Sequence, residues 1–378
     1  MTVNAAYRVG TVPVLISDFL VTTEPGRARS IDLPSFPNIS EVTDPLTGVS
    51  MVGLQRKSAV IGNSIAITGS GNAASIKQII NRLSKYMQKD ESIDILKDYL
   101  GTQTEFKGAR CCILVGHHVG QKISTFRWDS ATGVFAAGLG FVEGSGAEMF
   151  RSVVPFFDQQ GDPHPDYVFD RCVEDTLHVT ATLYANEIAH GNTLERHFGG
   201  GYDVFIYVDG MFRRIEEVVY LFYRLKILGP DTMRVYPQPV YIKNMYFGDV
   251  GFIISFLTDS AVRRNAEPHQ RVARIEPLIT GNHQVPNIPI ESISLNSPKI
   301  AIGFLGEAIT GEEEVFTAVV QGDEARQFNI FIGDKWQGKL REVRFECPEI
   351  IMNNISQAAF LKFIRKTAEE FLRSTGVK

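Results

Sequence analysis

The stretch Thr2–Asp18, TVNAAYRVGTVPVLISD, contains the first strong structural signal of the chain. Gly10 divides it into two short runs that are rich in residues favoured in strands, and a glycine between two such runs is typical of a turn. We therefore predict a pair of strands joined at Gly10. This places Thr2 at the start of the first strand and Asp18 at the end of the second.

The residues that follow show three successive patterns, which are typical of a loop, a strand pair and a helix. Residues 22–55 hold four prolines, many small polar residues and few apolar positions, which predicts a long loop. Lys57 then opens a second strand pair, KSAVIGNSIAITGSG, with a Gly-Asn turn. From Asn72 to Leu100 apolar residues recur at steps of three and four, which predicts an amphipathic helix broken near residues 89–90.

The remainder repeats this order once and then becomes rich in strands. Strand patterns up to residue 146 precede two predicted helices, at 147–157 and about 166–190, and the strand YDVFIYVDG follows. Runs of strands followed by helices favour an α+β fold over alternating βαβ units. After about residue 225 the patterns are mostly strands, and a final amphipathic helix is predicted at 355–374.

Composition sets limits on the class of protein. The 378 residues are 44% hydrophobic and 21% charged, which are ordinary globular values. This length exceeds the usual size of one compact core, so we expect a core domain over residues 1–225 and a β-rich extension over 226–378. The net charge of −5 gives no indication of nucleic acid or an anionic membrane as a main partner, since both call for a basic face.

Several sites and destinations lack a sequence signal. The four cysteines and eight histidines show no spacing typical of zinc, and no nucleotide-binding motif is present, so we expect neither a metal nor a cofactor. No signal-peptide pattern and no apolar run of about 18 residues occurs. We therefore expect reduced, buried cysteines in a cytoplasmic protein.

Four further features share an order that is known from one enzyme family. Thr2 and Asp18 lie sixteen positions apart, and Lys57 starts the next strand. Ser70-Gly71 comes thirteen to fourteen residues after that lysine, at the start of the first predicted helix, and Gly144-Ser145-Gly146 opens a later helix. In this arrangement residues 2–215 resemble the β-type subunits of the proteasome, which are N-terminal nucleophile (Ntn) hydrolases.

The resemblance implies a fold, an activity and an assembly. The fold would be a four-layer αββα sandwich, here followed by a β-rich C-terminal extension. The activity would be that of a threonine protease, a hydrolase that cleaves amide bonds in a polypeptide or peptide. Related proteins enclose such sites in rings, so the resemblance also implies a homo-oligomer, with an unfoldase as an additional partner.

The resemblance also assigns a role to each residue. Thr2 would be the nucleophile, and its free α-amine would serve as the base, because an α-amine titrates near 7.7–8.0. Lys57 would lower the pKa of that amine, and Asp18 would hold Lys57 in place and keep it charged. The N–H of Gly71 would receive the oxyanion, and Ser145 would hydrogen-bond around the amine and a water molecule.

Two features depart from what catalysis requires. The family keeps an Asp and, three residues later, a Ser before a Gly-Gly pair, whereas this chain has Arg196 and Gly199. Glu195 and His197 are candidate substitutes. In addition, Met1 precedes Thr2 and would block its α-amine. Because methionine before a small residue is normally trimmed, an active form could arise without a propeptide.

Substrate preference and two alternative functions complete the expectations. The family position two before the oxyanion glycine floors the main specificity pocket. Here it is Gly69, with Ala73 nearby, which predicts a deep pocket for a bulky apolar side chain. One alternative function is a catalytically inactive scaffold or interaction subunit with the same fold. A second is a small-molecule amidase of the wider Ntn group.

Overall fold

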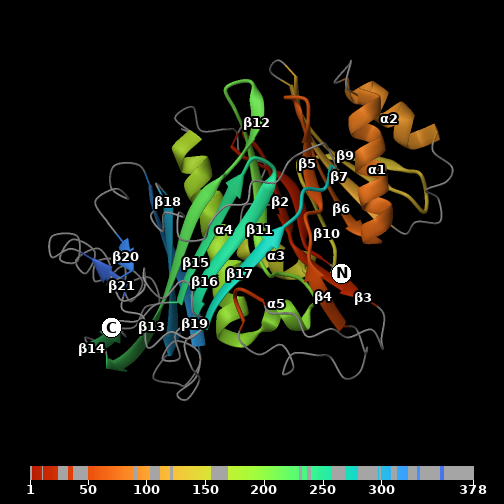
Figure 1. Cartoon of the computed structure of the whole chain (residues 1–378). Helices are drawn as coiled ribbons and strands as arrows, with labels where there is room; N and C mark the ends of the chain where they lie inside the picture. The colour runs from red at the N-terminus through yellow and green to blue at the C-terminus, as the bar shows by residue number, and fades with distance from the viewer. Residues whose placement is uncertain are drawn as a thin grey trace.

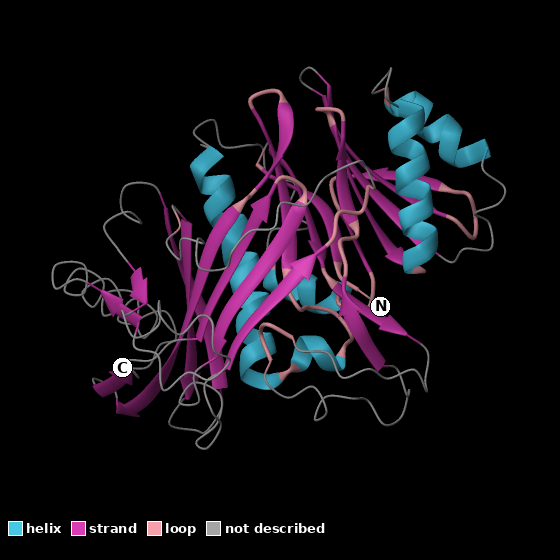
Figure 2. Ribbon diagram, viewed as in Figure 1, coloured by secondary structure: helices cyan, strands magenta, loops and turns pink. Residues whose placement is uncertain are grey.

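The structure is a computed structural model, shown in Figure 1, and it describes most of the first 257 residues and shorter segments beyond them. The described residues are 2–10, 12–23, 33–36, 50–87, 92–102, 111–119, 122–154, 169–229, 232–235, 240–257, 269–279, 297, 299–307, 313–321, 330–332 and 350–352. Met1, most of the predicted loop 22–55 and the predicted helix 355–374 lie outside them. The described part is a mixed α+β structure in which antiparallel sheets predominate (Figure 2).

The first sheet is built around the predicted N-terminal strand pair. Its order is β10-β1-β2-β11-β12, and every neighbouring pair is antiparallel. Gly10 lies between β1 and β2 as predicted, and its positive φ of 58° suits a tight turn that few other residues adopt. The strands are β1 (Asn4–Val9), β2 (Val12–Asp18), β10 (Phe141–Glu143), β11 (Tyr202–Val208) and β12 (Met211–Arg214).

The second sheet is an antiparallel succession of neighbouring strands with two helices against it. Its strands are β5 (Ser58–Ile61), β6 (Ile65–Gly71), β7 (Cys111–Val119), β8 (Lys122–Asp129) and β9 (Phe135–Gly138). The helix predicted from Asn72, with a break near residues 89–90, is present as two helices, α1 (Ala73–Tyr86) and α2 (Ile93–Thr102). Asn72 caps α1 by accepting a hydrogen bond from the Ser75 N–H at 3.0 Å. The buried face of α1 consists of Ile76, Ile79, Ile80 and Leu83.

Apolar side chains from the two sheets meet in a small buried cluster. Ala6 and Leu15 come from the first sheet, and Ala66 and Leu114 come from the second. The helices α1 and α2 share a different cluster with the other face of the second sheet. The two sheets are therefore close neighbours, and the site described below lies where they meet.

The remaining described helices are α3 (Ala147–Val153), α4 (Phe169–His190) and α5 (Asn192–Glu195). Figure 1 shows α4 beside the first sheet on one side and a third, larger sheet on the other. The order of that sheet is β17-β16-β15-β13-β18-β19, with β14 also paired to β13. Its strands are β13 (Glu217–Gly229), β14 (Thr232–Val235), β15 (Val240–Phe247), β16 (Val250–Leu257), β17 (His269–Ile275), β18 (Lys299–Glu307) and β19 (Glu313–Gln321).

Two small strand pairs complete the described elements. They are β3 (Leu20–Thr23) with β4 (Ser50–Leu54), and β20 (Ile330–Ile332) with β21 (Ile350–Met352). The pair β3–β4 brings together the two ends of the predicted loop: β3 follows Asp18 in the chain, and β4 ends shortly before Lys57.

The expected domain boundary at residue 225 falls inside β13. Val218, Tyr220 and Phe222 on this strand share one buried cluster with α4 and with β1, β2 and β11 of the first sheet. A second connection is polar: Asp203 on β11 lies 3.1 Å from both Arg56 and Arg214 and accepts a hydrogen bond from the Tyr246 hydroxyl on β15 at 2.9 Å. The third sheet is therefore packed on the N-terminal part across a continuous core.

Candidate functional site

The register of the first strand pair brings Thr2 to Asp18. Asn4 pairs with Ser17, and the Asp18 N–H donates to the Val3 carbonyl oxygen at 3.1 Å, so the pairing extends one residue beyond β1. The Thr2 hydroxyl donates to Asp18 Oδ1. The Val3 N–H donates to the same oxygen at 3.0 Å. A separation of sixteen residues therefore becomes direct contact because the turn at Gly10 folds the chain back on itself.

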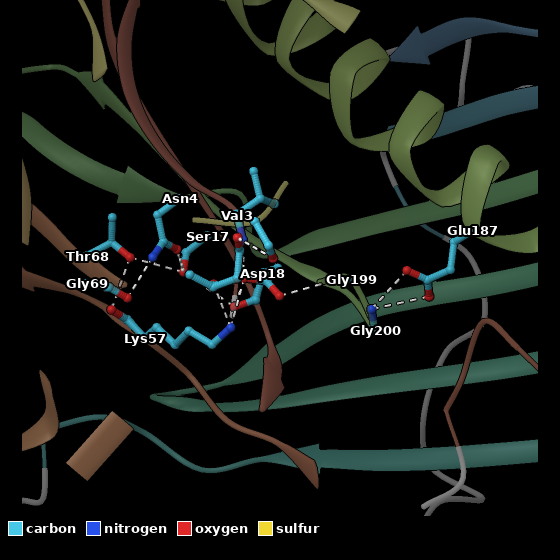
Figure 3. A network of polar contacts seen from close by, with 12 residues as sticks. Val3, Asn4, Ser17, Asp18, Lys57, Thr68, Gly69, Glu187, Gly199 and Gly200 are labelled. Carbon is cyan, nitrogen blue, oxygen red and sulfur yellow. Dashed lines mark hydrogen bonds and ion pairs between the residues drawn. The ribbon is translucent and has the colours of Figure 1, made fainter. Parts of the chain in front are cut away.

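Lys57 reaches this pair from the second sheet. Its Nζ lies 2.7 Å from Thr2 Oγ1 and 2.8 Å from Asp18 Oδ1. Figure 3 shows Lys57 extended toward Asp18. Thr2 is 2% exposed, Asp18 0% and Lys57 5%, so the three groups interact away from bulk water. Burial lowers the pKa of Lys57, and the Asp18 carboxylate opposes that shift by stabilising the ammonium form.

A polar chain beneath the site fixes one sheet against the other. The Asn4 side-chain amide donates to the Gly69 carbonyl oxygen at 2.6 Å and accepts from the Ser17 hydroxyl at 2.6 Å. The Thr68 hydroxyl lies 3.1 Å from both Ser17 Oγ and the Lys57 carbonyl oxygen. Figure 3 shows these groups beside Asp18 and Lys57. The backbone of Lys57 is thus held by the sheet that faces Thr2.

The Gly144-Ser145-Gly146 turn surrounds the carbonyl group of Thr2. The Gly146 N–H donates to the Thr2 carbonyl oxygen at 3.2 Å, and the Ser145 hydroxyl lies 3.5 Å from the same atom. Gly144 has a φ of +103°, and a Cβ placed on it would overlap the Thr2 carbonyl oxygen. A glycine is needed there because the turn approaches Thr2 so closely.

Gly71, Gly69 and Ala73 lie along the second sheet and the helix that follows it. Gly71 ends β6 and is exposed, one residue before the cap of α1, and Ala73 is the half-buried first residue of that helix. Gly69 is buried, and a Cβ on it would come within 2.6 Å of Ile76 Cγ2. Packing against α1 therefore gives a reason for the small residue that is independent of the predicted substrate pocket.

The glycines before β11 contact the opposite oxygen of Asp18. The Gly199 N–H donates to Asp18 Oδ2 at 3.0 Å. The Gly199 and Gly201 carbonyl oxygens accept from the N–H groups of Leu20 and Phe19 at 3.0 and 3.1 Å. Backbone contacts therefore support Asp18 at the position where the resemblance leads one to expect a serine.

Glu187 on α4 holds the same segment from the other side. Its carboxylate accepts the Gly200 N–H at 3.1 and 3.2 Å, the Thr193 hydroxyl at 2.7 Å, and the Ser35 hydroxyl. Glu187 is 0% exposed, and burial raises its pKa to about 7 despite these hydrogen bonds. A Cβ on Gly199 would overlap Glu187 Oε2, so the carboxylate occupies the space of a larger side chain at position 199.

The suggested substitutes for the missing Asp and Ser, Glu195 and His197, differ in their exposure to solvent. Glu195 and Arg196 are exposed, and the Arg196 guanidinium lies 3.6 Å from Glu148. His197 is buried, but its backbone adopts a φ of 61° in the turn before the glycines. Sequence reasoning missed Glu187, although one signal was present. An acidic residue on the apolar face of a predicted helix is rare unless its carboxylate is paired or hydrogen-bonded.

The described residues contain no candidate metal site and no candidate membrane-spanning helix. No group of three or more His, Cys, Asp or Glu side chains in that part of the chain is arranged to hold a metal ion. No helix there is both long and apolar enough to cross a bilayer.

The comparisons with known proteins give no further assignment. No family model matches the chain, and no curated protein matches it significantly.

Proposed function

We propose that the chain is an Ntn hydrolase that cleaves amide bonds through an acyl-enzyme ester on Thr2. In this proposal the two five-stranded sheets and their flanking helices form the αββα sandwich of that family. One observation carries the proposal: the Lys57 ammonium lies within hydrogen-bond distance of both Thr2 Oγ1 and Asp18 Oδ1 in a buried site. A threonine hydroxyl used only for packing has no need of this costly arrangement.

The chemistry requires Thr2 to carry a free α-amine, and Met1 lies outside the described residues. After removal of Met1, the amine would take the proton of the Thr2 hydroxyl as Oγ1 attacks the substrate carbonyl carbon. The carbonyl oxygen would gain a negative charge and accept the Gly71 N–H. Collapse of this intermediate would break the C–N bond and pass the proton to the departing amine. Water would then hydrolyse the ester and regenerate Thr2.

Lys57 and Asp18 would act on this step through charge. The ammonium, 2.7 Å from Oγ1, favours the developing alkoxide and lowers the pKa of the neighbouring amine. The Asp18 carboxylate offsets the cost of burying that ammonium. The Gly146 N–H and the Ser145 hydroxyl would fix the Thr2 backbone through its carbonyl oxygen.

The burial of Thr2 favours a second candidate function. Its exposed fraction is 2%, so a substrate can reach Oγ1 only after the atoms that cover it move. A catalytically inactive subunit that keeps the polar cluster for stability would have the same geometry. The homo-oligomeric ring, the unfoldase partner and the peptide substrate remain predictions from the resemblance.

Turnover of short fluorogenic peptides tests the proposal. The panel would carry bulky apolar, basic or acidic side chains before the cleaved bond, and simple acyl amides would be included as small substrates. We expect hydrolysis of the apolar peptides by the wild-type chain and none by Thr2→Ala. Preference for acidic peptides would contradict the predicted pocket at Gly69 and Ala73. Cleavage of small amides alone would favour the amidase alternative.

A further inference from the structure

The environment of Glu187 is unusual for a structural residue. Its carboxylate is completely buried and accepts hydrogen bonds from Ser35, Thr193 and Gly200. No Lys or Arg among the described residues forms an ion pair with it. Removing a carboxylate from water without a cation is costly, and three hydrogen-bond donors offset only part of that cost. Glutamine of the same shape would avoid the charge, so the charge itself needs an explanation.

The contacts of the glycine segment connect Glu187 to the proposed nucleophile. Glu187 accepts the Gly200 N–H, and the adjacent Gly199 N–H donates to Asp18 Oδ2 at 3.0 Å. Asp18 Oδ1 in turn contacts Thr2 Oγ1 and Lys57 Nζ. Two consecutive backbone N–H groups therefore link two buried carboxylates, with Glu187 on one side and Asp18 with the proposed catalytic cluster on the other. Figure 3 shows this order from Lys57 through Asp18 to Glu187.

We propose that Glu187 is a positioning residue for the Thr2 site, which fixes Asp18 by holding the Gly199–Gly200 segment when its carboxylate is ionised. The proposal rests on the proposed hydrolase function. Glu187 thereby takes over the supporting role for which the chain lacks the expected side chains at positions 196 and 199. Because Ser35 also donates to this carboxylate, the same residue connects the site to the segment 33–36.

The direction of the pH effect follows from the hydrogen bonds. The ionised carboxylate accepts all three donors, whereas the protonated form must turn one O–H toward a hydroxyl and gives up part of this set. The pKa of Glu187, raised by burial to about 7, places this change within the range of an activity assay. The other titratable groups that act on it are Asp18, Tyr184 and Tyr202. Burial raises the pKa of both tyrosines well above the ordinary value, so they stay neutral throughout that range.

The test compares wild type, Glu187→Gln and the control Glu174→Gln, which changes a half-exposed glutamate on the same helix. The first readout is the rate at which a peptide epoxyketone labels each protein from about pH 5.5 to 8.5, a range centred on the pKa of Glu187. Taking the ratio of wild-type to variant rate removes the titration of the Thr2 amine, which is common to both. We expect the Glu187→Gln ratio to rise from near one at the acid end to roughly tenfold to a hundredfold at the alkaline end. The Glu174→Gln ratio should stay near one.

The second readout is hydrogen–deuterium exchange of a peptide that spans residues 198–201. At alkaline pH the Glu187→Gln variant should exchange this segment faster than wild type, and at acid pH the two should agree. Thr193→Val, which removes one donor and keeps the shape of the side chain, should shift both readouts in the same direction by a smaller amount. This variant also replaces Glu187→Gln if the latter does not fold.

The two readouts separate the proposals. Unlabelled wild-type protein with altered exchange in Glu187→Gln would contradict the hydrolase function and leave the holding of Gly199–Gly200 intact. Unchanged exchange, or a labelling ratio that is the same at every pH, would overturn the positioning role of Glu187.

Discussion

At the scale of single residues, the site depends on charges that compensate one another. Lys57 and Asp18 are both almost completely buried, and each is tolerable only because the other lies 2.8 Å away. The Thr2 hydroxyl oxygen contacts both Asp18 and Lys57. The hydroxyl is thus held between a carboxylate and an ammonium, which is an arrangement suited to losing its proton and costly to disturb.

Replacing Lys57 with Met tests this compensation. The change keeps much of the apolar stem and leaves Asp18 buried without its cation. We expect the free energy of unfolding to fall by about 3–5 kcal/mol at neutral pH and peptide hydrolysis to be lost. Urea denaturation and turnover assays measure the two effects. Unchanged stability of the variant would show that Lys57 does not offset the cost of burying the Asp18 carboxylate. A fully active variant would contradict the role of the ammonium.

Gly144 offers a comparison between crowding and backbone strain. Gly144→Ala would place a Cβ against the Thr2 carbonyl oxygen, whereas Gly133, which also has a positive φ, has no atom within 4 Å of such a Cβ. Gly133→Ala should therefore cost only the backbone strain, about 1–3 kcal/mol. We expect Gly144→Ala to cost more and to abolish turnover. Thermal denaturation of both variants measures the difference, and equal losses would refute the close approach of the turn to Thr2.

The pKa of Glu187 predicts a pH dependence of stability with a defined sign. In the unfolded chain its pKa is near 4.5, and in the folded chain it is about 7, so between these values the folded state binds more protons. The contribution of Glu187 to the free energy of unfolding therefore falls as pH rises from about 4.5 to 7, in total by about 3 kcal/mol. Urea titrations of wild type and Glu187→Gln should diverge over this window. Parallel stability-versus-pH curves for the two proteins would mean that the pKa of Glu187 is not raised in the folded chain.

At the scale of elements, local signals predicted more than distant pairings did. The strands β1 and β2 could be predicted because both flank Gly10, and α1 could be predicted because its buried residues recur at helical spacing. Thr2 contacts Asp18, Lys57 and Ser145 although these residues are far apart in the sequence. Glu187 could not be placed, because its partner Ser35 lies 152 residues earlier in the chain, although Thr193 and Gly200 are close to it in sequence.

The strand β13 shows the limit of periodicity. Val218, Tyr220 and Phe222 are buried on one face, and Val219, Leu221 and Tyr223 are buried on the other, so the strand lacks the alternation of a half-exposed one. It also pairs in parallel with β18, about eighty residues later in the chain. No local sequence pattern predicts that β13 pairs with β18. The domain boundary expected at residue 225 consequently fell within a central strand.

At the scale of the whole molecule, the third sheet is part of the same core as the first. The cluster that contains α4 includes side chains of β1 and β2 as well as β13, β15 and β18. The buried Asp203 also connects β11 to Tyr246 on β15. The N-terminal part therefore presents to the rest of the chain an apolar face that is not suited to water.

Truncation after residue 225 tests this dependence. The shortened chain would cut β13 and remove β15 and β18, its neighbours in the third sheet. We expect it to be unfolded or insoluble, because the apolar side chains that cover α4 would be lost. Circular dichroism and cooperative thermal unfolding would be compared with the full-length chain. A soluble fragment with a sharp transition would show that residues 1–225 fold alone.

The most direct test of the whole account is to locate the covalent adduct of a peptide epoxyketone by mass spectrometry of the intact protein and its peptides. We predict a chain lighter than the encoded one by a methionine residue, with the adduct on Thr2 in wild type and no adduct in Thr2→Ala. A chain that retains Met1 and carries no adduct, or one labelled at another residue, would contradict the claim that Thr2 is the nucleophile.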